Sequence, residues 1–221
     1  MADATPSWTT ELAYAIGIIT SDGCLSQDGR HLSVSSKDVQ LLETVRVCLG
    51  LRVAITPYRG GNGCTYHHLQ WGSRLFHAWL VELGLMPAKS KRLAALAIPD
   101  DYFVDFLRGC IDGDGSIVSY VDRYHVAKNP KYVYTRLYVS LVSASPPFLA
   151  WVQSTSRRVV GVSGYLARKD NRPGGIWVLK YAKYESIRLL EHLYYKQDLP
   201  CLDRKRQLAI RLLGVRKRRA K

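Results

Sequence analysis

Two aspartates, Asp22 and Asp114, lie 92 residues apart in the same local context, and both could take part in metal chemistry. Each ends an apolar stretch that has a glycine in its middle, "LAYAIGIITSDG" and "FLRGCIDGDG". Two carboxylates held close together repel each other, so such a pair is typical of a site where a divalent cation balances the charge. Cations of this kind activate water for phosphodiester hydrolysis. The residue types therefore predict a shared divalent-cation site, provided that the fold brings the two stretches together.

Small residues in both stretches predict that the two aspartates meet. Ala13 and Gly17 lie four residues apart, and Gly109 lies four residues before Gly113. Small residues at helical spacing let two helix backbones approach closely, whereas leucines in their place would hold the backbones apart. We therefore predict that Gly17 and Gly109 form the interface of two crossing helices. The alternative is that each Asp-Gly pair only caps a turn before a strand, but its recurrence favours the shared site.

The order of local sequence signals repeats in the two parts of the chain. Each part reads as a helix, two strands, a helix, two strands and a helix, and the strands of the second part are longer. Beyond the two aspartate-ending helices, the first part predicts strands at 31–36, 51–58 and 64–71 and helices at 37–50 and 73–84. The second part predicts strands at 116–126, 132–142, 163–170 and 175–183 and helices at 145–161 and 184–195, with one more helix at 202–214 after the repeat. We predict an α+β protein of two pseudo-symmetric units, residues 1–100 and 101–221; a single mixed domain that only looks repetitive is the alternative.

Charge is distributed unevenly along the 221 residues. The net charge is +14, yet residues 1–105 carry nine lysines and arginines against ten acidic residues, and the remainder carry 23 against eight. An excess of this size favours a polyanionic partner, nucleic acid before membrane, because neutralising phosphates releases counterions. No apolar stretch approaches the ~18 residues of a membrane span, and the first residues do not resemble a signal peptide. We expect an intracellular protein of the cytoplasm, nucleoid or an organelle matrix, without a membrane partner.

The cysteines do not indicate a disulfide framework or a zinc site. The five of them never form a C-x-x-C pair; they are Cys24, Cys48, Cys64, Cys110 and Cys201. Scattered cysteines are typical of buried thiols in a reducing compartment. His67 and His68 lie near Cys64, but a second pair of ligands is missing, so we do not expect a metal there.

The two aspartate-ending stretches resemble the motifs of a known family. "FLRGCIDGDGSI" resembles the defining motif of the LAGLIDADG homing endonucleases, whose common form is FLRGxxDGDGSI, and "AYAIGIITSDGCL" is similar to the divergent first copy in their two-motif, single-chain members. The repeat covers the chain from about Leu12 to Leu213. The resemblance implies two αββαββα units joined through their motif helices, with two four-stranded antiparallel sheets forming a saddle over DNA. It also implies divalent-metal-dependent cleavage of both DNA strands within a long target.

Metal-binding roles follow from this resemblance. Asp22 and Asp114 match the family's metal-binding carboxylates, and Ser21 and Gly113 match positions whose backbone carbonyls help to hold the ion. The implied cofactor is Mg²⁺, in whose place Mn²⁺ or Ca²⁺ can bind. The two interface glycines predicted above match the helix-packing glycines of the family.

The family often has a basic residue late in each unit that approaches the active site. Here Lys89 and Lys205 are the candidates, with Lys91 as the alternative to Lys89. Such a lysine could orient water or stabilise the charged phosphate, whereas on a solvated helix it would do neither. The first motif departs from the second in having Thr20 where the second has Asp112, so we expect Asp112 to be structural.

A twisted sheet in the major groove would read DNA with alternate strand residues. Candidate contacts are Arg30, His31, Arg59, His67 and Gln70 in the first unit, and Arg123, His125, Arg136, Tyr138, Arg168, Arg172 and Lys180 in the second. Which of them face the DNA depends on strand register, because a slip of one residue turns every side chain over.

We expect a monomeric, Mg²⁺-dependent, site-specific endonuclease that acts on double-stranded DNA and needs no protein partner. The main alternative is a nucleic-acid-binding protein on the same scaffold, such as an RNA maturase for intron splicing or a regulator. An endonuclease embedded in an intein is a weaker alternative, because the chain begins with Met rather than Cys or Ser and ends in a basic tail rather than His-Asn.

Overall fold

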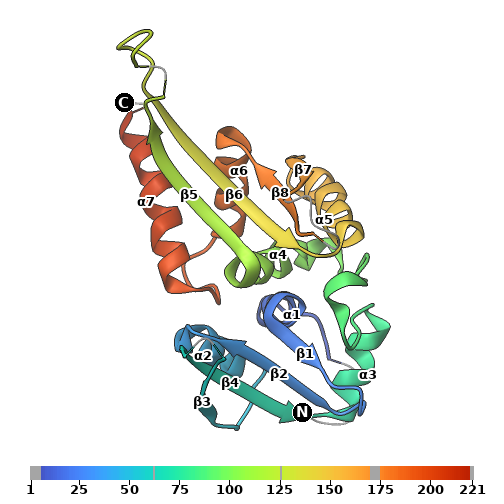
Figure 1. Ribbon diagram of the computed structural model, residues 1–221. Helices are drawn as coiled ribbons and strands as arrows, with labels where there is room; N and C mark the ends of the chain where they lie inside the picture. Colours follow the sequence, from blue (N-terminus) through green and yellow to red (C-terminus); the bar gives the residue numbers. More distant parts are fainter. Residues whose placement is uncertain (1–5, 62, 125, 170–174, 220–221) are drawn as a thin grey trace.

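A computed structural model describes residues 6–219 of the chain apart from 62, 125 and 170–174, and its elements follow the same order twice (Figure 1). The first unit contains α1 (Thr10–Asp22), β1 (Gly23–Leu25), β2 (His31–Ser36), α2 (Val39–Cys48), β3 (Ile55–Arg59), β4 (Thr65–Gly72), α3 (Arg74–Glu82) and the 3₁₀ turn η1 (Lys89–Lys91). The second contains α4 (Asp100–Asp114), β5 (Gly115–Asp122), β6 (Tyr134–Ser143), α5 (Pro146–Val159), β7 (Tyr165–Arg168), β8 (Trp177–Tyr181), α6 (Lys183–Leu193) and α7 (Asp203–Arg219).

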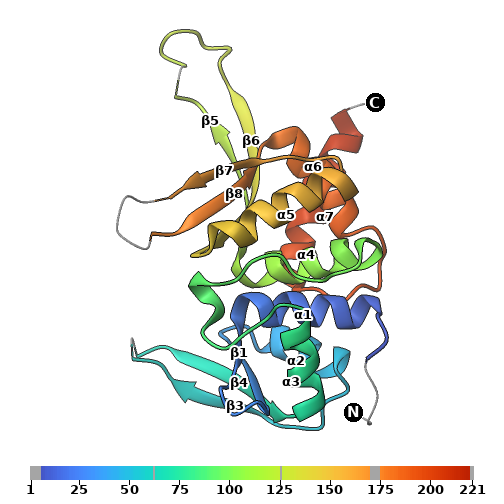
Figure 2. The same ribbon diagram turned by 90° about the vertical axis from the view of Figure 1, so that its right-hand side faces the viewer.

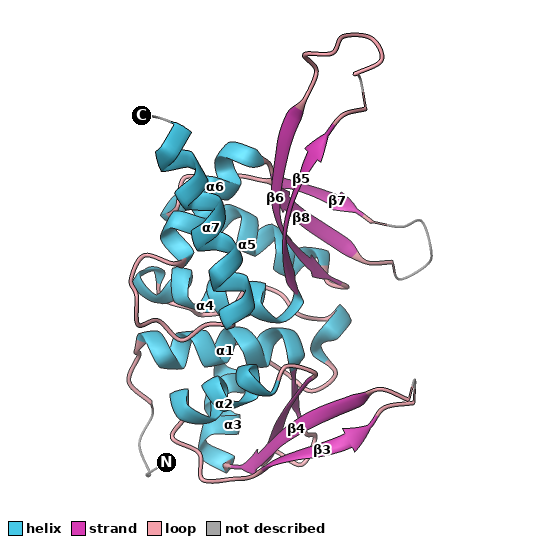
Figure 3. Cartoon of the chain, turned by 90° about the vertical axis from the view of Figure 1, so that its left-hand side faces the viewer, coloured by secondary structure: helices cyan, strands magenta, loops and turns pink. Residues whose placement is uncertain are grey.

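Each unit forms one four-stranded antiparallel sheet. The strand orders are β1-β2-β4-β3 and β5-β6-β8-β7, so the two sheets have the same topology. The helices gather on one side of the molecule, and the strands of both sheets lie on the other side (Figure 3). This arrangement confirms the predicted α+β fold of two αββαββα units.

The helices α1 and α4 cross at the centre of the molecule, between the two sheets (Figure 2). Thr9 caps α1, since its hydroxyl accepts a hydrogen bond from the backbone N–H of Leu12 at 3.1 Å, and Asp100 and Asp101 provide the favourable negative charge in the first turn of α4. Every residue of α1 from Leu12 to Thr20 is buried, as expected of a helix packed on all sides. Among the described residues, no helix is both long and apolar enough to cross a bilayer.

Alternation along the strands separates a helix-covered face of each sheet from an open face. In β2, Leu32 and Val34 are buried, and they lie opposite Trp71 and Leu69 of β4, which are buried too. In β6, Leu137, Val139 and Leu141 occupy the covered face in the same way. Because side chains alternate, the intervening positions of each strand point to the open face.

Several expectations from the sequence need correction. The strand predicted from residue 51 begins only at Ile55, and the last helix continues to Arg219 instead of ending near 214. Of the five cysteines, Cys110 and Cys201 are buried, whereas Cys24 is exposed. Cys24 is accessible because it pairs with Ser33 on the open face of the first sheet.

Candidate active site

The predicted interface glycines lie where α1 and α4 touch backbone to backbone. A Cβ atom placed on Gly17 would lie 2.1 Å from the carbonyl oxygen of Phe106, and one on Gly109 would lie 2.2 Å from the carbonyl oxygen of Tyr14. At Gly113, a Cβ atom would lie 2.3 Å from the carboxylate oxygen Oδ2 of Asp22. The close crossing therefore brings the ends of the two motif helices together.

Asp22 and Asp114 lie near each other at these helix ends. Loss of surrounding water and the negative charge of Asp114 together raise the pKa of Asp22 to about 6. Loss of water also raises the pKa of Asp114. The Ser21 hydroxyl, which donates to the carbonyl oxygens of Gly17 and Ile18 at 3.2 and 3.1 Å, lies 3.4 Å from Oδ2 of Asp22. Asp22 is half-buried and Asp114 is exposed, so solvent reaches the pair from one side. Two carboxylates held close together with raised pKa values are the electrostatic situation that a cation relieves.

Lys89 and Lys205 reach this carboxylate pair from two different elements. The Lys89 ammonium donates to the carbonyl oxygen of Gly23, directly after Asp22. The Lys205 ammonium donates to the carbonyl oxygens of Gly115, directly after Asp114, and of Asp112, both at 2.8 Å. Burial lowers the pKa of both lysines, that of Lys205 to about 8.

Both lysines act on both carboxylates, because each of them lowers the pKa of Asp22 and of Asp114. Lys89 lowers the pKa of Asp114 more than Lys205 does, and Lys205 lowers the pKa of Asp22 more than Lys89 does. Lys91, the alternative to Lys89, is exposed.

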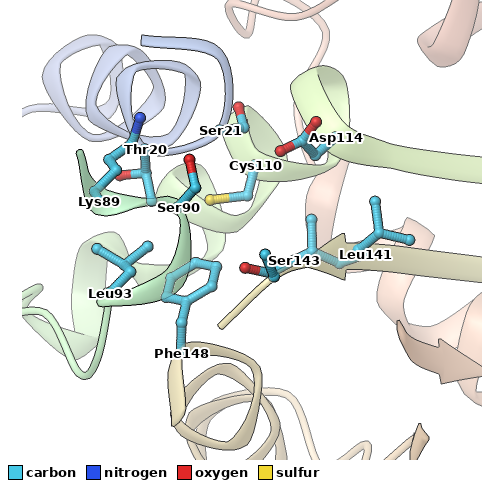
Figure 4. Close-up of a pocket in the computed structure, with 12 residues that line it drawn as sticks. Thr20, Ser21, Lys89, Ser90, Leu93, Cys110, Asp114, Leu141, Ser143 and Phe148 are labelled. Carbon is cyan, nitrogen blue, oxygen red and sulfur yellow. The ribbon is translucent and has the colours of Figure 1, made fainter. Parts of the chain in front are cut away.

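A small cavity of about 70 Å³ lies beside Asp114 and Lys89 (Figure 4). Its polar lining also includes Thr20, Ser21 and Ser143, and Figure 4 shows the side chains of Ser21 and Asp114 on the same side of the Cys110 thiol. The volume holds only a few water molecules. Sequence reasoning did not identify Ser143 or Cys110 as neighbours of the site, because neither carries a pattern that sets it apart from other residues of its element.

The donor set fits a hard divalent cation. The described residues contain no group of three or more His, Cys, Asp and Glu side chains that could hold a metal ion, so the available donors are the carboxylates of Asp22 and Asp114 with nearby backbone oxygens. Oxygen donors with room for retained water suit Mg²⁺, Mn²⁺ or Ca²⁺ rather than zinc. The close packing of the two helix ends, where a Cβ atom on Gly113 would lie 2.3 Å from the Asp22 carboxylate, is the observation that supports this fit.

In metal-free protein, we expect the Asp22→Asn variant to be more stable than the wild type at pH 8. Because the pKa of Asp22 rises from 3.8 to about 6 on folding, the folded state favours the neutral carboxyl group. The stability that it contributes is present below about pH 4 and is lost as the pH rises through 6. Thermal unfolding in EDTA should show a Tm higher by a few degrees for the variant at pH 8, and a difference that shrinks toward pH 4.

The Asp101→Asn variant is the matched control, because Asp101 is exposed at the start of α4. It should show no comparable gain in Tm at pH 8. A wild type more stable than Asp22→Asn at pH 8 without metal would contradict the electrostatic description of the site.

In the first sheet, strand register brings some of the predicted DNA contacts to the open face and turns others away. Gln70 lies opposite Ser33 on that face, and His31 begins β2 on the same side. His67 shares the covered face with Leu69 and Trp71, which does not favour it as a contact. His68, its neighbour, points to the open face and bonds to Ser35 through Nδ1 at 2.8 Å. Arg30 is exposed and precedes β2. Arg59 is the last residue of β3, at a position that the alternation of side chains assigns to the covered face.

In the second sheet, three predicted contacts form one cluster on the open face. Tyr138 packs under the Lys180 ammonium, which lies 3.7 Å from the ring centroid, and Lys180 pairs with Ser140 across β8 and β6. Arg136 has the same parity, and its Nε donates to Asp122 Oδ2 at 2.9 Å. Tyr120 and Tyr134, which we did not predict, complete the cluster; their alternation with apolar residues in β5 and β6 is the signal that could have found them.

The remaining candidates of the second unit lie at strand ends or outside the described residues. Arg123 is exposed and follows β5, and Arg168 ends β7 opposite Trp177, with the parity of the covered face. His125 and Arg172 lie outside the described residues.

Comparisons with known proteins place the fold. No protein-family model matches the chain, and the search of curated proteins found no relative. Meganuclease I-SmaMI bound to uncleaveable DNA matches with a TM-score of 0.64 at 13% identity, over 98% of this chain and 92% of that one. I-DmoI in complex with DNA and Ca matches with a TM-score of 0.59 at 15% identity, over 90% of this chain and 96% of that one.

A third similar structure is full-length DUF199/WhiA from Thermatoga maritima, with a TM-score of 0.58 at 16% identity. The match covers 96% of this chain and 63% of that one, so this chain spans less than two thirds of the WhiA structure. Further similar structures contain I-DmoI and DNA with Mn or Mg. Identities this low show a shared fold and nothing finer. The chain has the fold of the LAGLIDADG homing endonucleases, which is found also in the N-terminal LAGLIDADG domain of WhiA.

Proposed function

We propose that the protein is a site-specific, divalent-metal-dependent endonuclease that cuts both strands of a long DNA target. The observation that carries this proposal is the meeting of Asp22 and Asp114 at the helix crossing, with Lys89 and Lys205 beside them. A DNA-binding scaffold without catalysis has no need for a carboxylate pair whose ionisation is opposed by desolvation and mutual repulsion.

Asp22 and Asp114 would hold the cation together with the backbone carbonyls of Ser21 and Gly113. When bound, a divalent cation supplies an activated water and stabilises negative charge that develops on the phosphate. The ammonium groups of Lys89 and Lys205 keep positive charge beside the same region. This charge would stabilise the negative charge of the transition state. Each aspartate would serve one strand of the duplex, in line with the pairing of the two units.

The open faces of the two sheets would bind the target. The Tyr138–Lys180–Arg136 cluster offers cationic and aromatic groups to phosphates and bases, whereas the open face of the first sheet carries mostly neutral polar groups. Because the two parts of the chain differ in net charge, the protein would bind the two half-sites of the DNA target with unequal strength. We further propose that one chain, as a monomer, carries the complete site, and that it works inside the cell or an organelle.

Incubation of the purified protein with a randomised plasmid library and Mg²⁺ tests this proposal. Sequencing of the linearised products should recover one family of long related targets. Plasmids that remain circular with Mg²⁺ and with Mn²⁺ would remove the endonuclease assignment. DNA retention without cutting would then favour the alternative, a nucleic-acid-binding protein or an RNA maturase on the same scaffold.

We expect DNA affinity to fall about 10³-fold between 50 and 200 mM salt, because binding releases counterions from several phosphates. The Lys180→Gln variant should reduce the slope of log K against log salt by about one, since it removes one cationic contact. Arg158→Gln is the matched control, because Arg158 pairs with Asp100 on the helical side. Equal slopes for wild type and Lys180→Gln in a fluorescence anisotropy titration would exclude Lys180 from the interface.

A further inference from the structure

We infer that Asp112 positions Lys205 through the first turn of α7, and that the first unit holds Lys89 without an equivalent side chain. The catalytic consequence of this difference rests on the proposed function. The difference itself lies in a set of buried polar contacts that the proposed chemistry does not use.

The Asp112 carboxylate holds the residue from which α7 starts. Asp112 is 1% exposed, and its Oδ2 accepts hydrogen bonds from the backbone N–H of Leu202 at 2.7 Å and from the hydroxyl of Tyr14 at 3.0 Å. Leu202 directly precedes α7, and its carbonyl oxygen accepts from the backbone N–H of Lys205 at 3.0 Å and of Arg206 at 3.1 Å. The carboxylate therefore fixes the first turn of the helix, at the end where negative charge is favourable.

The Lys205 side chain contacts Asp112, the same residue whose carboxylate holds the start of α7. Its ammonium donates to the backbone carbonyls of Asp112 at 2.8 Å and Ile111 at 2.5 Å, in addition to that of Gly115. Asp112 thus contacts the start of the α7 turn with its side chain and the end of the lysine with its backbone. Because both contacts are buried, the turn cannot shift without leaving polar groups unpaired.

A second side chain of α4 holds the segment before α7. Arg108 lies one helical turn before Asp112 and is fully buried. Its Nε donates to the carbonyl oxygen of Pro200 at 2.9 Å and its Nη1 to that of Leu193 at 3.0 Å, while Asp105 balances its charge at 2.7 Å. The polypeptide that leads into α7 is therefore tied to α4 on both sides of Cys201.

Among its described residues, the first unit lacks this connection. Thr20 occupies the place of Asp112, and its hydroxyl donates to the carbonyl oxygen of Ile16 in its own helix at 2.7 Å. Lys89 lies in the short turn η1 and follows Ala88, whose φ of 53° is in the left-handed region. For Lys89 the described contacts include one carbonyl partner, against three for Lys205. The two lysines are thus held to different extents, and loss of the Asp112 carboxylate should disturb one of them.

Hydrogen exchange tests the positioning without reference to activity. In Asp112→Ala, the backbone amides of residues 203–206 should exchange at least about tenfold faster than in the wild type, because a buried hydrogen-bond acceptor at the helix start is lost. Asp112→Asn keeps an acceptor oxygen and should change exchange less. Thr20→Val should leave exchange of these amides unchanged. Wild-type exchange at 203–206 in Asp112→Ala would overturn the inference.

Strand-resolved cleavage tests the consequence, with a target selected from the plasmid library and each strand labelled at its end. Asp112→Ala should slow the cutting of one strand about tenfold relative to the other. Tyr14→Phe removes another donor to the same carboxylate but leaves the Leu202 contact, so the ratio between strands should stay at its wild-type value. Should Asp112→Ala fail to fold, Asp112→Asn should still slow the cutting of one strand relative to the other, by a smaller factor.

The outcomes separate the inference from the proposed function. Equal slowing of both strands by Asp112→Ala, or by Asp112→Asn where the alanine variant does not fold, would overturn the inference while leaving the endonuclease in place. A wild type that cuts neither strand would end the proposed function and with it the predicted strand bias, and hydrogen exchange would then decide the positioning of α7.

Discussion

Replacement of Asp22 or Asp114 by asparagine is expected to lower double-strand cleavage by at least about 10³-fold, because each change removes a charged oxygen donor from the proposed cation site. DNA affinity should stay within a few fold of the wild type or rise slightly, since a negative charge near the phosphates is lost. A plasmid assay that separates circular, nicked and linear DNA measures the first effect, and fluorescence anisotropy in Ca²⁺ measures the second.

The Asp101→Asn variant controls for removal of a carboxylate from the same helix as Asp114. Asp101 is exposed in the first turn of α4, at the opposite end of the helix from Asp114. It should cleave at the wild-type rate. Normal double-strand cleavage by both Asp22→Asn and Asp114→Asn would refute the mechanism, whatever their affinities.

Replacement of Gly109 by alanine is expected to destabilise the protein by about 3 kcal/mol or more, as in severe overpacking of a core. The new Cβ would lie 2.2 Å from the carbonyl oxygen of Tyr14 and 2.9 Å from the Cα of Gly17. Both are backbone atoms of a buried helix, so the helices would have to separate. Alanine in place of glycine gains about 1 kcal/mol of helix propensity, which is too little to offset the clash.

Thermal unfolding should therefore show a Tm lower by roughly 6–12 °C for Gly109→Ala. Gly61→Ala is the matched control, because Gly61 lies in the turn after β3, where a Cβ atom would meet only open space, and the change should alter the Tm little. A Gly109→Ala protein as stable as the wild type would mean that α1 and α4 do not cross as closely as the structure has them.

The helix crossing and the pairing of the aspartates could be predicted from the sequence because both depend on local patterns. A glycine in the middle of an apolar helix has few purposes other than close packing. Because such a glycine occurs in both motif helices, as Gly17 and Gly109, the sequence indicates a symmetric contact. The repeated order of helices and strands could be predicted for the same reason, since hydrophobic period and turn residues are local signals. Seven of the eight strands in the two sheets lie where ranges were predicted, with shifts of a few residues at their ends, and only the short strand β1 had no predicted range.

The facing of individual side chains could not be predicted, because it depends on strand register. His67 and His68 are adjacent and chemically identical, yet His67 shares the covered face with Leu69, and His68 pairs with Thr56 on the open face. The alternation of Leu69 and Trp71 could have assigned the two faces of β4. That assignment holds only once β4 is known to be a strand with one covered face, paired on its two sides with β2 and β3.

Contacts between remote segments were also outside the reach of sequence patterns. Asp112 was expected to be structural, and its burial and its bonds to Tyr14 and Leu202 agree with that expectation. Its partners lie 98 and 90 residues away, and although Tyr14 belongs to the first motif, Leu202 belongs to none. The role of the segment before α7 therefore emerges only from the packed structure.

Anomalous diffraction from crystals soaked in Mn²⁺ tests the central claim most directly, because Mn²⁺ takes oxygen ligands as Mg²⁺ does and can be located by its own scattering. We predict a manganese peak within coordination distance of both the Asp22 and the Asp114 carboxylates. The same peak should be lost in the Asp22→Asn, Asp114→Asn double variant. Crystals that show manganese only elsewhere, or carboxylates too far apart to share an ion, would contradict the claim.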